Sequence, residues 1–195
     1  MPAGAGGVKP RPGSIGAGRG FWVISEAVGR PSVFLGLGSN VGNREEALER
    51  ALAGLEARDF HVDAASSLYL TEPVGGPAQG WFLNAVVRGQ TPLGPEALLD
   101  ACLGLETSLG RVRSVPDGPR TLDLDILLYG DEVRDTGVLR LPHPRLQERR
   151  FVLVPLAEIA PDVRHPVLQL TASELLARCA DTYRVEKAVT RRSLA

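Results

Sequence analysis

The chain has 195 residues, of which 44% are apolar and 23% charged, and its formal net charge is -1. This length suits one domain with a single core. A charge so close to zero gives no reason to expect a nucleic acid or an anionic membrane as partner, and no apolar run approaches the roughly 18 residues that span a bilayer. The two cysteines, Cys102 and Cys179, are too far apart in sequence to suggest a disulfide framework or a metal pair, which favours a reducing, cytoplasmic setting.

The N-terminal segment differs in composition from the rest of the chain. Residues 1–20 are rich in Gly, Pro and Ala and carry only three charged side chains. Such a segment buries too little apolar surface to offset the entropy of ordering it. We therefore expect residues 1–31 to form a disordered extension, residues 32–187 to form the domain, and residues 188–195 to form a flexible tail.

Apolar runs and helical spacings alternate through the domain. In chain order we expect a strand at 33–37, a helix capped by Asn43, strands at 61–69 and 81–88 around a Pro/Gly loop at 71–79, a helix at 95–109 and a strand at 122–129. Short helices are expected at 151–159 and 171–179, where Thr171 and Glu174 have capping-box spacing. The order strand–helix–strand–strand–helix–strand predicts an α+β fold with a ferredoxin-like antiparallel sheet and helices on one face.

The glycines of residues 36–43 invite a phosphate-loop interpretation. The segment contains neither Gly-Lys-Ser/Thr nor G-x-G-x-x-G, so neither the P-loop nor the dinucleotide-binding motif is present. We assign these glycines instead to a tight turn between the first strand and the first helix.

Two acids mark the strand that follows residue 121. Alternate side chains of a strand share a face, so Asp123 and Asp125 point to one side, about 6.6 Å apart along the chain. Carboxylates at that spacing can hold one Mg²⁺, or two that are bridged by phosphate oxygens. The alternative is a strand with a plain solvated face, and the two acids alone do not decide between these interpretations.

Three arginines precede these acids. Arg111, Arg113 and Arg120 lie in a segment rich in Pro and Gly, which predicts a loop. Guanidinium groups beside paired carboxylates are what magnesium–triphosphate chemistry requires, because the metal neutralises some phosphate oxygens and the arginines bind the others. The alternative is a solvent-exposed basic loop whose Arg–Asp pairs contribute little.

An aromatic and an amide follow the Pro/Gly loop. Phe82 and Asn84 alternate onto one face of the third strand, and together they suit a flat heterocycle with a lactam edge. A core phenylalanine and a turn-stabilising asparagine are the simpler alternative. Further along, His143 stands between two prolines that fix its backbone, in a basic segment with Arg149, although a lone histidine is usually structural.

Taken in order, these segments resemble the dihydropterin pyrophosphokinase family between about Val33 and Pro161. The matching segments are Gly-Leu-Gly-Ser-Asn at 36–40, 71–75, Phe-Leu-Asn-Ala at 82–85, Gly-Arg-Val-Arg at 110–113, Gly-Pro-Arg-Thr-Leu-Asp-Leu-Asp at 118–125, Leu-Pro-His-Pro at 141–144, Arg149 and Phe151. The Arg-Thr-Leu-Asp-Leu-Asp string is the most specific of them. The segment 114–118 departs from the pattern, since it is one residue shorter and carries Asp117 where a tryptophan often stands.

The resemblance implies a ferredoxin-like fold and a reaction in which a pterin hydroxymethyl oxygen attacks the β-phosphorus of ATP and AMP leaves. It implies two Mg²⁺ ions on Asp123 and Asp125, with Arg111 and Arg120 as catalytic residues. The residues implied to bind the pterin are Thr71, Val74, Phe82, Asn84 and Phe151. The residues implied to bind ATP are Glu106, Arg111, Arg113, Ile126, His143 and Arg149. ATP and a hydroxymethyl dihydropterin are then the partners of a protein that we expect to be monomeric.

Two other functions compete with this interpretation. Another magnesium-dependent nucleotidyl- or phosphoryl-transfer enzyme could carry the paired aspartates on the same fold, but it would not need the Phe82 and Asn84 pocket. A non-catalytic ferredoxin-like module that binds a small ligand or RNA would call for exposed aromatics and a basic surface. The chain has 5% aromatic residues and no net positive charge, which argues against RNA.

Overall fold

The structure is a computed structural model that describes residues 30–111 and 118–189. Its elements in chain order are β1 (Val33–Ser39), α1 (Arg44–Glu56), β2 (His61–Ala65), β3 (Tyr69–Thr71), β4 (Phe82–Gln90), α2 (Pro95–Ser108), β5 (Asp123–Tyr129), β6 (Arg134–Asp135), β7 (Arg140–Leu141), η1 (Leu146–Glu148), α3 (Arg150–Ile159), α4 (Ala172–Arg178) and β8 (Val185–Lys187). Across the described part of the chain, no helix is both long and apolar enough to cross a membrane. The predicted extension and tail lie mostly outside the described residues and stay predictions.

The main sheet is antiparallel, with the strand order β5-β1-β4-β3-β8 and with β2 also paired to β4. β1 lies between β4 and β5 and pairs with both along nearly its whole length. This is the order that a ferredoxin-like β-α-β-β-α-β chain produces when β2 and β3 together take the place of its second strand. The predicted α+β, ferredoxin-like fold is confirmed.

The strand predicted at 61–69 is two strands in the structure. β2 pairs with residues 87–90 of β4, and β3 pairs with residues 82–84. Between them, the backbone N–H of Ser66 donates to Val86 O at 2.9 Å, and its Oγ accepts from Val86 N–H at 3.0 Å. A side-chain oxygen thus takes the place of a main-chain carbonyl in the hydrogen-bond ladder. The apolar pattern of the sequence does not predict this break in the strand.

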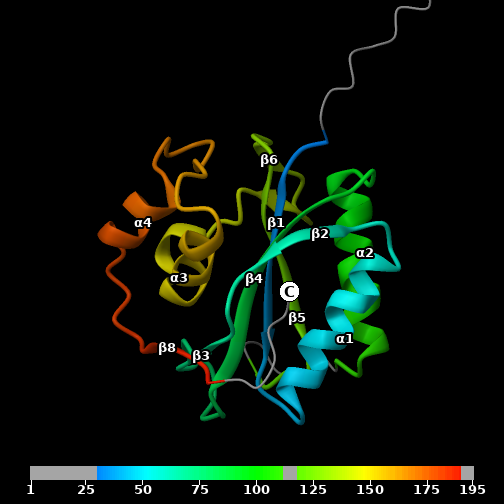
Figure 1. Ribbon diagram of the computed structural model, residues 1–195, viewed down its shortest axis with the longest axis vertical. Helices are drawn as coiled ribbons and strands as arrows, with labels where there is room; N and C mark the ends of the chain where they lie inside the picture. Colours follow the sequence, from blue (N-terminus) through cyan, green and yellow to red (C-terminus); the bar gives the residue numbers. More distant parts are fainter. Residues whose placement is uncertain (1–29, 112–117, 190–195) are drawn as a thin grey trace, which may run out of the picture.

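Helices cover both faces of the sheet, α1 and α2 on one side and α3 and α4 on the other (Figure 1). α1 and α2 pack on the face that includes Leu35 and Leu124, whereas α3 and α4 pack on the face that includes Phe34 and Val86. The prediction of helices on one face is therefore wrong for the C-terminal helices. β1 explains why, because six of its seven residues are buried and it offers no solvated face.

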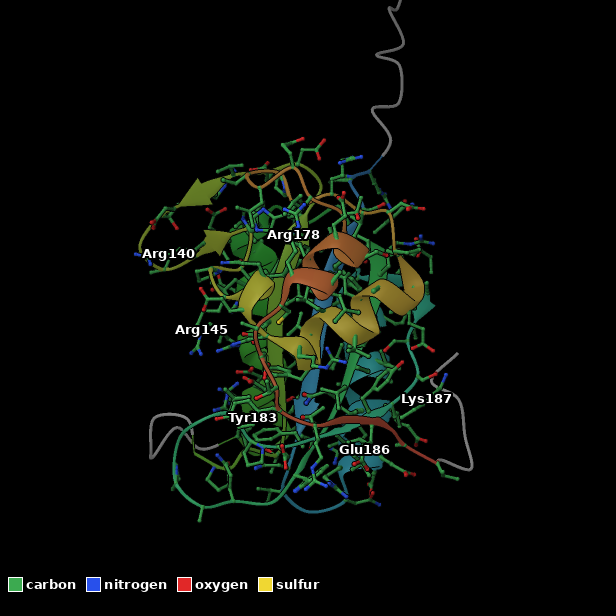
Figure 2. The ribbon with its side chains drawn as sticks, turned by 90° about the vertical axis from the view of Figure 1, so that its left-hand side faces the viewer. Arg140, Arg145, Arg178, Tyr183, Glu186 and Lys187 are labelled. Carbon is green, nitrogen blue, oxygen red and sulfur yellow. The ribbon has the colours of Figure 1, made fainter. Side chains whose placement is uncertain are left out.

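The C-terminal segment returns along the outside of the sheet, passing Tyr183 to reach β8 (Figure 2). β8 pairs antiparallel with β3, and the N–H of Ala188 donates to Leu68 O at 2.8 Å. The sequence Val-Glu-Lys is short and lacks apolar alternation, so it does not predict this edge strand. The edge of the sheet beside the Pro/Gly loop is thereby covered by the end of the domain.

Candidate active site

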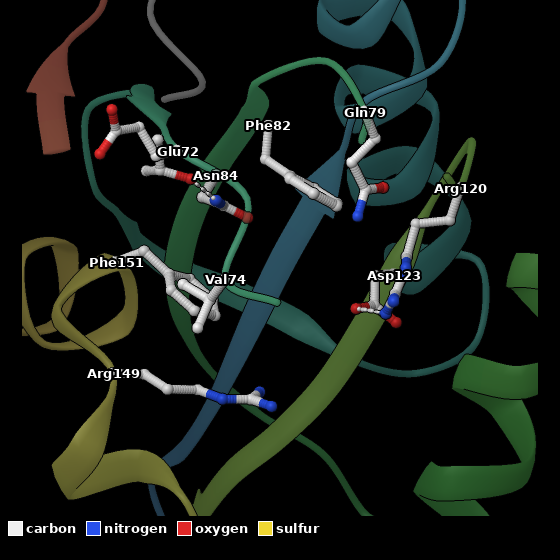
Figure 3. A pocket seen from close by; sticks show the side chains of 10 residues that line it. Glu72, Val74, Gln79, Phe82, Asn84, Arg120, Asp123, Arg149 and Phe151 are labelled. Atoms are coloured by element: carbon white, nitrogen blue, oxygen red, sulfur yellow. Dashed lines mark hydrogen bonds and ion pairs between the residues drawn. The ribbon is translucent and has the colours of Figure 1, made fainter. Parts of the chain in front are cut away.

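A crevice lies on the sheet face that carries α3, beside the start of that helix (Figure 3). Its space, the open mouth included, is about 510 Å³. Strand alternation places Asn84 and Asp123 on this face, because Leu83 and Leu124 point into the core beneath α1 and α2. The lining residues are Thr71, Glu72, Val74, Gln79, Phe82, Asn84, Arg120, Asp123, Arg149 and Phe151.

One half of the crevice carries the aromatic side chains and, apart from Glu72, uncharged polar ones. Phe82 comes from the start of β4, and Phe151 comes from the first turn of α3 (Figure 3). Each ring has a guanidinium nearby, since Cζ of Arg120 is 5.9 Å from the Phe82 centroid and that of Arg149 is 5.5 Å from the Phe151 centroid. The five residues predicted to bind a pterin, Thr71, Val74, Phe82, Asn84 and Phe151, all line this crevice.

Neutral contacts fix the amide of Asn84 in this half. Its Nδ2 donates to Thr71 Oγ1 at 2.6 Å, and both side chains are buried. Its Oδ1 lies against Gly38, where the Cβ of any other residue would be 2.6 Å from that oxygen. The hydroxyl of Thr71 therefore fixes the amino end of the amide, and the absence of a side chain at Gly38 leaves room for its oxygen. The carbonyl edge of a flat ligand and an N–H beside it are what such an amide can bind.

The other half of the crevice is charged, with Asp123 at its centre. Arg111 Nη1 lies 2.5 Å from Asp123 Oδ1, and Arg120 Nη1 lies 2.6 Å from Asp123 Oδ2. Arg111 also pairs with the buried Glu106, whose Oε1 accepts from Leu124 N–H at 2.8 Å. The loop arginines thus meet the first acid directly, so the interpretation as a solvated basic loop does not hold for Arg111 and Arg120.

Asp125 lies in the adjoining hollow, which it shares with Gly36 and Gly38. Its side chain is 38% exposed, and its Oδ2 is 3.9 Å from Arg149 Nη1. Desolvation by the surrounding atoms, followed by the negative charge of Asp123, raises the pKa of Asp125 to about 6. A carboxylate whose charge is disfavoured by a neighbouring carboxylate is relieved by a shared cation, and Mg²⁺ commonly binds one or two carboxylates and completes its shell with substrate phosphates and water. The donor set therefore fits magnesium.

Four residues predicted to bind ATP are not in the crevice lining, and of these Arg111 reaches it only through its contact with Asp123. Glu106 is buried and holds Arg111, as described above. The side chain of Ile126 lies in the core beneath α1 and α2. His143 Nδ1 accepts from Arg145 N–H at 3.2 Å, and burial, followed by the charges of Arg149 and Arg145, lowers the pKa of His143 to about 4. The imidazole is thus neutral, with Nε2 as its N–H donor. Arg113 belongs to the segment 112–117, outside the described residues.

The glycines assigned to a turn divide into two groups. Gly36 and Gly38 lie inside β1, which runs on through Ser39, and they form the floor of the hollow at Asp125. The assignment to a turn is wrong for both, because a strand needs glycine where other groups approach its face. Gly42 does belong to the turn before α1 and has a φ of +68°.

The sequence matches a known family over most of the domain. A sequence model of the 7,8-dihydro-6-hydroxymethylpterin-pyrophosphokinase (HPPK) family matches residues 34–161. The chain belongs to this family. The match ends at α3 and the loop that follows it, so the HPPK region contains every element that lines the crevice.

Relatives with this HPPK region are known in several bacteria. The 2-amino-4-hydroxy-6-hydroxymethyldihydropteridine pyrophosphokinase of Methylorubrum extorquens is 49% identical over 132 residues, which cover 67% of this chain and 83% of that protein. The protein of the same name from Pseudomonas aeruginosa is 44% identical over 148 residues, which cover 75% and 91%.

A solved structure shares the fold. The crystal structure of wild-type Plasmodium falciparum HPPK-DHPS superposes with a TM-score of 0.61 at 17% identity, over 79% of this chain and 45% of that one. A likeness at this identity supports the HPPK fold alone. The chain spans less than half of that solved chain.

Two crevice residues, Glu72 and Gln79, were not among the predicted site residues of this HPPK chain. Both stand in the Pro/Gly loop, where no periodicity tells which side chains turn inward. Glu72 follows the predicted Thr71 directly, and Gln79 comes three residues before Phe82. Only the folded loop shows that both residues line the crevice, Gln79 with its amide and Glu72 with its carboxylate turned to Arg184.

Proposed function

We propose that this crevice carries out the HPPK reaction, in which the hydroxymethyl oxygen of 6-hydroxymethyl-7,8-dihydropterin attacks the β-phosphorus of ATP. Diphosphate passes to the pterin, AMP leaves, and the product enters folate biosynthesis. The observation that carries this proposal is the meeting, in one crevice, of the aromatic and amide residues with an aspartate that two arginines bind. Membership of the family makes the chain a pyrophosphokinase, and the proposal assigns roles to its residues.

The pterin is proposed to lie between Phe82 and Phe151, whose rings can stack on its two faces. Asn84 would bond the amide-like edge of the pterin, because its orientation is already fixed by Thr71 and Gly38. Thr71 and Val74 would contribute main-chain groups from the start of the Pro/Gly loop. A flat, polar-edged ring fits this half of the crevice better than a sugar or a peptide does.

The phosphates are proposed to occupy the charged half. Asp123 and Asp125 would hold two Mg²⁺ ions, which neutralise phosphate oxygens and so favour attack by a weak nucleophile. Arg111 and Arg120 form ion pairs with Asp123, and their guanidinium groups can leave its carboxylate to bind phosphate oxygens instead. Glu106, buried behind Arg111, keeps that guanidinium at the crevice when the exchange occurs. These arginines would stabilise the charge that builds up as AMP leaves.

The nucleotide is proposed to extend from Arg149 toward His143. Arg149 lines the crevice, and the neutral imidazole of His143 can donate one hydrogen bond from Nε2. Ile126 would contribute main-chain groups alone, because its side chain is in the core. Arg113 completes the set from the segment outside the described residues. We further propose that the protein acts as a cytoplasmic monomer.

A thermal-shift experiment separates this proposal from another phosphoryl-transfer enzyme on the same fold. A non-hydrolysable ATP analogue with Mg²⁺ should raise the melting temperature, and added 6-hydroxymethyl pterin should raise it further by mass action. A pterin-independent enzyme would respond to the nucleotide alone. The absence of any additional shift at saturating pterin would contradict the proposal.

A further inference from the structure

Asn40, the first residue after β1, joins the two halves of the crevice. On the charged side its N–H donates to Arg120 O at 3.1 Å, and its Oδ1 accepts from Arg120 N–H at 2.8 Å. The backbone of Arg120 is thus held on both its donor and its acceptor. This is the residue whose guanidinium binds Asp123.

The same amide holds the pterin loop with its other end. Asn40 Nδ2 donates to Gln79 Oε1 at 2.9 Å and to Gly80 O at 3.2 Å. Gln79 lines the crevice, and Gly80 lies two residues before Phe82. The carbonyl oxygen of one side chain therefore serves the arginine segment, while its amino group serves the loop that carries the aromatic wall.

We propose that Asn40 is a positioning residue that couples the binding of the two substrates. The inference rests on the proposed function, since it assumes a pterin in one half and nucleotide phosphates in the other. When Arg120 exchanges Asp123 for phosphate, its backbone moves with it and carries the Asn40 amide. That movement is transmitted to Gln79 and Gly80, so nucleotide binding places the loop that closes on the pterin.

Coupling of this kind is reciprocal. If the nucleotide tightens pterin binding by some factor, the pterin must tighten nucleotide binding by the same factor. Typical coupling factors lie between about 5 and 150. A residue that only stabilises the turn would lower the stability of the protein without changing that factor, and this difference makes the proposal testable.

The chain offers a matched control three residues away. Asn43 lies in the same turn and caps α1, where its Oδ1 accepts from Glu46 N–H at 3.3 Å and its Nδ2 donates to Glu46 Oε2 at 3.1 Å. In the described part of the chain, these contacts reach neither the arginine segment nor the pterin loop. Asn43→Ala therefore removes an asparagine of the same turn without cutting the proposed link.

Asn40→Asp cuts one side of the link. Aspartate keeps the oxygen that accepts from Arg120, but it loses the amino group and turns a negative charge toward the oxygens of Gln79 and Gly80. Asn40→Ala removes both sides. If the alanine variant does not fold, the aspartate variant still tests the proposal, because it retains the contact that orders the turn.

The experiment measures the dissociation constant of the pterin with and without a non-hydrolysable ATP analogue and Mg²⁺. We expect a coupling factor of about tenfold or more in the wild type and in Asn43→Ala, and a factor near one in both Asn40 variants. Affinity for each ligand alone should change by less than about threefold. At saturating nucleotide, the KM for the pterin should rise in the Asn40 variants more than kcat falls.

Two results would overturn the inference. One is a coupling factor in both Asn40 variants equal to that of Asn43→Ala, and the other is a wild-type protein in which the ligands bind independently. If the wild type forms AMP in the presence of the pterin, either result contradicts the coupling role of Asn40 and leaves the proposed function standing. A wild type that forms no AMP would instead contradict the proposed function.

Discussion

In the aromatic half of the crevice, neutral contacts inside the sheet hold Asn84, whereas in the charged half two guanidiniums hold Asp123. The first arrangement has no counter-charge to displace when a ligand arrives. The second satisfies its charges internally, and its groups must change partners before they can bind phosphate. One half is therefore shaped for a rigid ring, while the other holds paired charges that the nucleotide and its cations would rearrange.

The largest effect should come from removing the second acid. We expect Asp125→Ala to lower magnesium-dependent kcat by ~10³ or more, because metal ions contribute several kcal/mol to charge stabilisation and each 1.36 kcal/mol is a factor of ten. The fold should persist, because the substitution removes a carboxylate whose pKa is raised by its surroundings. Rates of AMP formation and circular-dichroism melting test this together. Asp63→Ala, at an exposed aspartate paired with Arg88, is the control.

A second substitution in the charged half replaces an arginine and leaves both aspartates in place. Arg120→Ala should lower kcat by about 10²- to 10³-fold, the cost of losing one preorganised group that stabilises charge in the transition state. Pterin affinity should fall less, because the Arg120 side chain approaches that half at the Phe82 ring, 5.9 Å from its centroid, and the substitution leaves the backbone contacts of residue 120 in place. Steady-state kinetics would show it. A kcat within a factor of three of the wild type would show that Arg120 does not act on the reacting phosphate.

The aromatic half can be tested with two glycines of one strand. Gly38→Ala should weaken pterin binding about 10- to 100-fold, because its methyl group would press on Asn84 Oδ1 and misplace a hydrogen bond worth roughly 1–3 kcal/mol. Gly36→Ala makes ordinary contacts of 3.5–3.7 Å with Leu127 and should change the affinity by less than about threefold. Calorimetric titration of the pterin into both variants compares them. Equal losses of pterin affinity in the two variants would mean that the position of the Asn84 amide does not determine pterin binding.

The smallest effect concerns an acid of α3 that lies outside the crevice lining. Glu158 of α3 accepts from Ser67 N–H at 2.8 Å, from Ser67 Oγ at 2.7 Å and from Lys187 Nζ at 3.0 Å. Burial opposes the charged form, but hydrogen bonds from Ser67, Lys187 and Tyr69 outweigh it and lower the pKa of Glu158. We expect Glu158→Gln to cost about 1–2 kcal/mol of unfolding free energy at pH 7, because hydrogen bonds to charged groups are lost.

The sign of the pH dependence follows from this lowered pKa. A carboxyl group with a lower pKa in the folded state stabilises the protein above its unfolded pKa, and this stabilisation is lost as the pH falls through the folded pKa. The difference between wild type and Glu158→Gln should therefore shrink below about pH 4. Denaturant unfolding at pH 7 and at pH 3 measures it. A gap between the two proteins that does not change with pH would contradict the account.

Much of the fold follows from local pattern. The Asn43 cap and the Thr171–Glu174 capping box both form as predicted, because each depends on residues three apart. Alternation along β5 likewise places Asp123 on the crevice face while Leu124 is buried on the other. Short-range periodicity is enough for these features, and the Arg-Thr-Leu-Asp-Leu-Asp string then identifies the family.

The features that the sequence does not predict depend on distant partners. Ser66 breaks a strand because its hydroxyl meets Val86, twenty residues away. Glu106 turns inward to Arg111 and Leu124 N–H, although a helical glutamate is ordinarily solvated. Asn40 carries no sign of its double role until both loops are folded against it. In each case the decisive contact joins segments that no local pattern relates.

If this crevice transfers diphosphate from ATP to a hydroxymethyl dihydropterin, the identity of the nucleotide product shows it. Purified protein incubated with ATP, Mg²⁺ and 6-hydroxymethyl-7,8-dihydropterin should form AMP and pterin diphosphate in equal amounts. Omission of the pterin or chelation of the metal should abolish both products. Formation of ADP in place of AMP, or AMP formation that does not depend on the pterin, would contradict the account.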